Sequence, residues 1–290
     1  MSSRSTPRSA EAAPAGAVAA APGVESDMSI ELPEREPVQA RLYGERPRGV
    51  TVPLVLHFHG GTFVSGGLDE GRNVARLLAK AGAVVVSLAY PLAPFPEPIE
   101  VGYAALEWLY KQRVKLAGKG AQVFLAGEEA GGNVAAGVAL IARDRAHPPL
   151  AGQILLSPML DPCAGTPSLR NANGDTARCR WATGWQEYLS RPMNATHPYA
   201  VPGSSLRLAG IAPTLVLVGK DDAMRDEALG FAGRLSDAGV RVTSSVLPSG
   251  ARCPDELYDP AYDECACSVT VEKHLRAFFA AAAPAATPPA

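Results

Sequence analysis

The chain lacks features that would assign it to several common classes of protein. None of its apolar runs approaches the roughly 20 residues that a membrane-spanning helix needs, so no membrane span is predicted. Its 27 basic and 29 acidic residues give a formal net charge of −2, and no basic block stands out. Proteins that bind nucleic acid usually concentrate lysine and arginine on one face. The composition therefore predicts no nucleic-acid partner.

Cysteine is scarce. The 290 residues include five cysteines, namely Cys163, Cys179, Cys253, Cys265 and Cys267. An odd number at irregular spacing, in a chain of this length, does not predict a disulfide framework. Cys265 and Cys267 could together hold a soft metal, but no second pair of ligands lies nearby at the spacing of a zinc site. We therefore expect no metal and no other cofactor, and a cytoplasmic location.

Both ends of the chain are rich in alanine and proline. The first 27 residues lack the Leu-rich apolar centre of a signal peptide, and Pro22 interrupts their weakly hydrophobic run. We therefore predict disordered tails at residues 1–27 and 281–290. The remaining residues, 28–280, suit a single α/β domain, because such folds often reach roughly 250 residues as one unit.

Apolar runs that end in turn residues predict six buried strands, at residues 52–61, 81–90, 121–127, 150–160, 212–222 and 240–250. Their apolar residues follow one another rather than alternate, which is typical of a parallel sheet covered on both faces. Stretches with helical spacing follow four of them, at 102–116, 131–146, 226–239 and 268–282. This alternation predicts an α/β fold with a doubly wound, mostly parallel sheet, whose ligands bind at the carboxyl ends of the strands.

Two glycine-rich turns lie where strands end. Residues 127–131, GEEAG, follow a strand and open a helix, which is the setting of the G-x-S-x-G turn that presents a catalytic serine. Glu129 occupies the serine position. Residues 59–62, HGGT, end an earlier strand and are similar to the HGGG turn whose amides form an oxyanion hole. Two such turns in this order strongly indicate a hydrolase-type site.

The sequence resembles the hormone-sensitive-lipase-like esterases of the α/β-hydrolase fold over most of residues 28–280. The similarity rests on HFHGGTFVSGG at 57–67, on VVVSLAYPLAPFPEP at 84–98, on AGEEAGGN at 126–133 and on the segment 197–228. That family uses a serine, a histidine in a G-x-x-H loop and an aspartate. The resemblance places these three residues at Glu129, Cys253 and Asp222, so the serine and the histidine are replaced.

The replacements remove the two groups that ester hydrolysis needs most. Without the histidine, Asp222 has no base to orient, and an acyl group on Glu129 would have no catalyst for its hydrolysis. We therefore predict a degenerate triad, and a non-hydrolytic pseudoenzyme that binds a small acyl or ester-like ligand or a partner. Two alternatives stay open. Glu129 could act as a general base for elimination, cyclisation or isomerisation, or the chain could be a weak carboxylic ester hydrolase.

The ligand-binding residues are expected on the oxyanion turn, at the start of the next helix and beside the lost histidine: His59, Gly60, Gly61, Thr62, Ala130 and Arg252. The helix N-terminus and the nearby amides favour the charged form of Glu129, so we expect it to be ionised. Arg252 could bridge Glu129 and Asp222 through its guanidinium fork. A small lid is expected around residues 160–200. The sequence indicates no oligomeric state.

Overall fold

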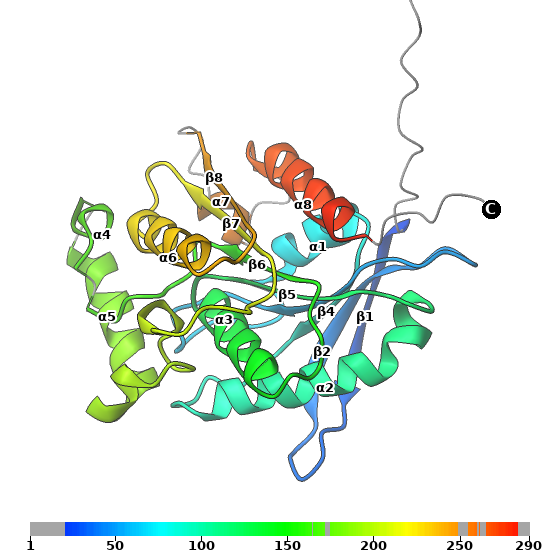
Figure 1. Cartoon of the computed structure of the whole chain (residues 1–290), viewed down its shortest axis with the longest axis horizontal. Coiled ribbons are helices and arrows are strands. Elements are labelled where there is room, and N and C mark those ends of the chain that lie inside the picture. The colour runs from blue at the N-terminus through cyan, green and yellow to red at the C-terminus, as the bar shows by residue number, and fades with distance from the viewer. Residues whose placement is uncertain are drawn as a thin grey trace, which may run out of the picture.

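A mixed β-sheet with helices on both faces forms the centre of the computed structural model (Figure 1). The structure describes residues 21–163, 165–171, 175–248, 255–259, 261 and 265–283. Within these residues, the strands are β1 (Ala21–Ile30), β2 (Val38–Glu45), β3 (Leu54–Phe58), β4 (Val84–Leu88), β5 (Val123–Glu128), β6 (Gly152–Leu156), β7 (Thr214–Gly219) and β8 (Val242–Leu247).

The strand order is β1-β2-β4-β3-β5-β6-β7-β8, and all neighbours from β4 to β8 run parallel. All six strands predicted from the sequence are present, so the predicted α/β, mostly parallel, doubly wound fold is confirmed. Every residue of β3, β4, β5, β6 and β7 is buried, because helices cover both faces of this part of the sheet.

The predicted boundary of the N-terminal tail was wrong. Strand β1 begins at Ala21, inside the predicted tail of residues 1–27, and pairs antiparallel with β2, which in turn pairs antiparallel with β4. Both β1 and β2 mix polar and charged residues with apolar ones, so neither contains the continuous apolar run that predicted the buried strands. Arg41 of β2 holds Asp27 of β1 with its Nε 2.5 Å from the carboxylate. Residues 1–20 lie outside the described residues.

The described helices are α1 (Arg72–Lys80), α2 (Glu97–Ala117), α3 (Glu129–Asp144), α4 (Pro167–Asn171), α5 (Asp175–Leu189), α6 (Arg225–Asp237), α7 (Asp255–Tyr258) and α8 (Ser268–Ala282), with 3₁₀ turns at Pro192–Thr196 and Pro202–Ser204. Helices α1 and α8 pack on one face of the sheet, while α2, α3 and α6 pack on the other (Figure 1). No helix in the described ranges is long and apolar enough to cross a membrane.

Helix α3 lies so close to the sheet that one of its positions has no room for a side chain. A Cβ atom on Gly131 would collide with the backbone carbonyl oxygens of Phe58 and His59, where β3 ends. The first turn of α3 and the end of β3 are therefore in backbone contact. This close approach holds the turn before α3 against the turn after β3, and so fixes the two turns that the sequence singled out.

We expect Gly131→Ala to lower the free energy of unfolding by about 1–3 kcal/mol, because the added methyl group must push backbone apart. The matched control is Gly230→Ala in α6, where an added Cβ meets nothing within 4 Å. Alanine favours a helix over glycine by about 1 kcal/mol, so the control should be slightly more stable than the wild type. Urea unfolding of the three proteins measures both changes. Equal stability of Gly131→Ala and the wild type would contradict the close approach.

Candidate functional site

Glu129 sits in a strained turn between β5 and α3. It is the first residue of α3 and has a φ of +46°, a left-handed conformation that is uncommon for residues other than glycine. A Cβ on Gly127 would collide with the backbone of Gly131, so this turn tolerates only small residues on its inner side. Backbone strain of this kind clusters at functional sites. The turn holds the side chain of Glu129 at the carboxyl edge of the sheet.

The amides of the HGGT turn bind carboxylates of the same chain. The Gly61 N–H donates to Oε2 of Glu129 at 3.1 Å. The Gly60 N–H donates to Oε1 of Glu128 at 2.9 Å. Two backbone donors of the predicted oxyanion hole are thus each engaged by an acidic side chain from the facing turn.

A buried hydrogen-bonded chain supports this turn from below. The other oxygen of Glu128, Oε2, lies 2.7 Å from Nε2 of His57, and Nδ1 of His57 lies 2.9 Å from Oγ of Ser87. Glu128, His57 and Ser87 are almost completely buried. Glu128 was not among the site residues predicted from the sequence. Its position as the last residue of a buried strand, facing a strand that contains His57, was an available signal.

The side chains of His59 and Thr62 are both buried in the oxyanion turn. The His59 ring stacks on Tyr90 with ring centres 4.4 Å apart, and burial lowers the pKa of His59. Thr62 and Phe63 have φ values of +53° and +66°. Thr62 therefore adopts the left-handed backbone that a glycine would adopt more easily at this position.

Helix α5, within the predicted lid region, packs directly on the oxyanion turn. A Cβ on Gly184 would collide with the carbonyl oxygen of Thr62. The rings of Phe63 and Tyr188 stack with centres 4.2 Å apart, and Trp185 packs against Phe63 at 4.8 Å. The helix and the turn therefore form one packed unit beside Glu129.

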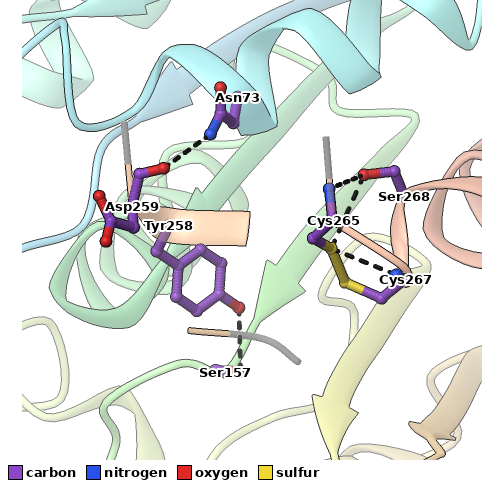
Figure 2. Close-up of a disulfide and its surroundings, with 7 residues drawn as sticks. All are labelled: Asn73, Ser157, Tyr258, Asp259, Cys265, Cys267 and Ser268. Carbon is purple, nitrogen blue, oxygen red and sulfur yellow. Dashed lines mark hydrogen bonds between the residues drawn. A yellow bond between two sulfur atoms is a disulfide. The ribbon is translucent and has the colours of Figure 1, made fainter. Parts of the chain in front are cut away.

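Asp222 follows β7 at the same edge of the sheet. Its Oδ1 accepts the Met224 N–H at 2.8 Å, and its Oδ2 accepts the hydroxyl of Ser157. Ser157 follows β6, has a φ of +44° and is buried. The Tyr258 hydroxyl donates in turn to Oγ of Ser157 at 2.9 Å (Figure 2). Asp222 thus ends a chain of two hydroxyl groups.

Sequence reasoning missed Ser157 and Tyr258. Ser157 closes a predicted strand at the ligand-binding edge, which was a weak signal, whereas Tyr258 could not be placed from spacing. Burial raises the pKa of the Tyr258 phenol well above its ordinary value, and the charge of Asp222 adds to this effect. The phenol therefore stays protonated and acts as a donor.

The expectation of an ionised Glu129 was wrong. The pKa of Glu129 is raised to about 7, chiefly by burial and also by the charges of Glu128 and Asp222, while Arg180 of α5 and the Gly61 amide act in the opposite direction. Withdrawal of the carboxyl from water thus outweighs the amide and the helix N-terminus. Near pH 7, Glu129 exists in both protonation states.

The remaining candidates fall into two groups. Ala130 is buried directly behind Glu129. Cys253 and Arg252 lie outside the described residues, so the proposed arginine bridge stays a prediction. Among the described residues, no group of three or more His, Cys, Asp or Glu side chains could hold a metal.

The cysteines differ in one respect from the sequence-based expectation. Cys265 and Cys267 form a disulfide, which the odd count and irregular spacing did not predict (Figure 2). The pair was not predicted because disulfide frameworks usually join distant segments, whereas a single residue separates these two cysteines. Cys163 is an exposed free thiol.

Comparisons with known proteins agree with this architecture. A family profile described as alpha/beta hydrolase fold matches residues 55–251. Esterase LipI of Mycobacterium tuberculosis is 32% identical over 225 residues, which are 74% of this chain and 70% of the relative. The gibberellin receptor GID1A of Arabidopsis thaliana is 34% identical over 208 residues, which are 67% of this chain and 60% of the receptor.

Solved structures give the same result. The carboxylesterase EstE1, cloned from a metagenomic library, superposes with a TM-score of 0.79 at 26% sequence identity and covers 92% of both chains. The matched profile spans both glycine-rich turns and β7, and the relatives share the sheet that positions them. The chain therefore belongs to the hormone-sensitive-lipase-like esterase family of the α/β-hydrolase fold.

Proposed function

We propose that the chain is a non-hydrolytic member of this family, a pseudoenzyme with a degenerate triad that binds a small acyl or ester-like ligand or a partner. The hydrogen bond from the Gly61 amide to Glu129 carries the proposal. The Glu129 carboxyl group occupies the Gly61 amide, a donor that an ester oxygen would need in the transition state. The chain therefore places its own carboxyl oxygen where a substrate would develop negative charge.

The surroundings of Asp222 support the same function. In a working triad, the aspartate accepts a hydrogen bond from the base and orients it. Among the described residues, the donors to Asp222 include the Ser157 hydroxyl and the Met224 amide, and neither of these two groups can remove a proton from a nucleophile. The relative named as a gibberellin receptor supports a binding role on this fold, because its name describes binding and not hydrolysis.

A general-base function for Glu129 is the second candidate. The raised pKa of Glu129, about 7, favours it. A carboxylate whose pKa lies near the working pH can accept a proton and return it, which suits elimination, cyclisation or isomerisation. The half-buried Glu129 side chain lies at the carboxyl edge of the sheet, where ligands of this fold bind.

The two functions differ in what the loss of Glu129 does to activity. We expect hydrolysis of p-nitrophenyl acetate by the wild type and by Glu129→Ala to stay at the level of a site without a triad, because neither protein pairs a nucleophile with a base at this position. Neither protein should react with a fluorophosphonate probe. Glu187→Ala, on the exposed side of α5, is the matched control. Hydrolysis that disappears only in Glu129→Ala would contradict the pseudoenzyme and favour a catalytic carboxylate.

Loss of the Glu129 carboxylate should strengthen the binding of a small carboxylate ligand. Removing its carboxylate frees the Gly61 amide and removes a like charge, so Glu129→Ala should bind butyrate about tenfold more tightly than the wild type does. Glu129→Gln removes the charge but keeps an acceptor on the amide, and should fall between the two. Isothermal titration calorimetry with butyrate at constant ionic strength measures this order. Equal affinities in all three proteins would place the ligand elsewhere.

The raised pKa of Glu129 also predicts how stability depends on pH. In the unfolded chain a glutamate has a pKa of about 4.3, so between about pH 4.3 and 7 the folded state binds more protons. The stabilisation is complete below about pH 4.3 and is lost as the pH rises through 7. Relative to Glu129→Gln, the wild type should lose about 2–3 kcal/mol of unfolding free energy between pH 4.5 and 8.

Urea unfolding of both proteins at several pH values measures this difference, and Glu187→Gln controls for the loss of an exposed charge. A constant difference between the wild type and Glu129→Gln across this range would mean that Glu129 has an ordinary pKa.

A further inference from the structure

The disulfide between Cys265 and Cys267 encloses a single residue, Ala266, and its Cα atoms lie 5.3 Å apart (Figure 2). The restraint that a disulfide places on the unfolded chain grows with the length of the loop that it closes. A bond across one residue therefore contributes little to the stability of the fold. Its role has to differ from the cross-linking of distant segments.

The two sulfur atoms have different surroundings. Sγ of Cys265 accepts the Cys267 N–H at 3.2 Å and the Ser268 hydroxyl at 3.7 Å. Both donors belong to the start of α8, whose N-cap is Cys267. Hydrogen-bond donors at a helix N-terminus stabilise a thiolate. Cys265 is therefore the better leaving group when the bond is broken.

Basic side chains lie near the same cysteine. Cys265 and Ser268 line a cavity of about 30 Å³ together with Arg76 and Lys80 of α1. Arg76 also pairs with Glu25 at 2.6 Å. The preference for Cys265 as the leaving group therefore rests on the two donors at the start of α8. The disulfide itself lies just below the surface, since Ala266 is exposed while both cysteines are buried.

The disulfide connects to Asp222 through described residues. Leu257, which is 1% exposed, belongs to the same apolar cluster as Cys265 and Cys267. The next residue, Tyr258, donates to Ser157, and Ser157 donates to Asp222. A change in the packing of Leu257 would thus move the phenol that ends the hydroxyl chain.

We propose that Cys265–Cys267 is a thiol–disulfide exchange site for dithiol reductants, and that Leu257 and Tyr258 transmit its redox state to Asp222. A thiolate of the reductant attacks Sγ of Cys267, the S–S bond breaks, and the electron pair leaves on Sγ of Cys265. The second thiolate of the reductant then attacks the reductant sulfur that is bonded to Cys267 in the mixed disulfide, and Cys267 is released as a thiolate. The reductant is oxidised to a disulfide by two electrons, and its two protons end on the cysteine pair.

Differential alkylation followed by mass spectrometry of the peptide with both cysteines measures the exchange, whatever the other three cysteines do. We expect about 1 mM dithiothreitol to reduce the bond within minutes in the folded protein. Ser268→Ala removes a donor to the leaving sulfur and should slow reduction about threefold. Val269→Ala is the matched control, because Val269 is 80% exposed and outside the contact, and it should leave the rate unchanged. A bond that resists reduction until urea is added would overturn the exchange site.

Fluorotyrosine labelling reports the transmission without any use of activity, so its result does not depend on the proposed function. The ¹⁹F resonance of Tyr258 is assigned by its absence in Tyr258→Phe. It should shift when dithiothreitol reduces the wild type, and it should be insensitive to dithiothreitol when Cys265 and Cys267 are both replaced by serine. Reduction of the disulfide with an unchanged Tyr258 resonance would overturn the transmission.

Discussion

The hydrogen bond between the Gly61 amide and Glu129 depends on backbone contact between α3 and β3. Gly131 brings the first turn of α3 against the end of β3, which places the two turns face to face. The same closeness that would let an amide meet a substrate oxygen lets it meet a carboxylate from the opposite turn. The fold of an esterase is thus retained while its central donor serves an intramolecular contact.

Three carboxylates at one edge of a sheet are electrostatically unfavourable, and the structure offsets each of them differently. Glu128 is paired with His57 and the Gly60 amide. Asp222 accepts hydrogen bonds from Ser157 and Met224. Glu129 has a single described amide donor, and its pKa rises to about 7 as a result of burial and of the other two charges. The least supported carboxylate is therefore the one that takes up the proton, as expected for like charges that share a site.

Pattern and resemblance predicted the parallel part of the sheet because short continuous apolar runs between turn residues are typical of strands buried on both faces. They also located the two turns, since glycines at fixed spacing after strands reflect steric needs that hold whatever residue stands at position 129. The edge strand β1 was missed because pairing with β2 stabilises a polar sequence that has no strong preference of its own. The protonation of Glu129 could not be predicted either. It depends on burial and on Glu128 and Asp222, which come together only in the folded chain.

Strand β1 also decides where the domain can be shortened. Its residues from Glu25 to Ile30 pair one by one with β2, so a chain that starts at residue 28, as the composition suggested, would keep only the last three of these pairs. The backbone N–H and C=O groups on the β1 side of β2 would then lose their partners between Arg41 and Glu45. An uncovered strand edge is a template for pairing with other chains. Shortened chains made for crystallisation or display therefore gain solubility by retaining residues that look dispensable by composition.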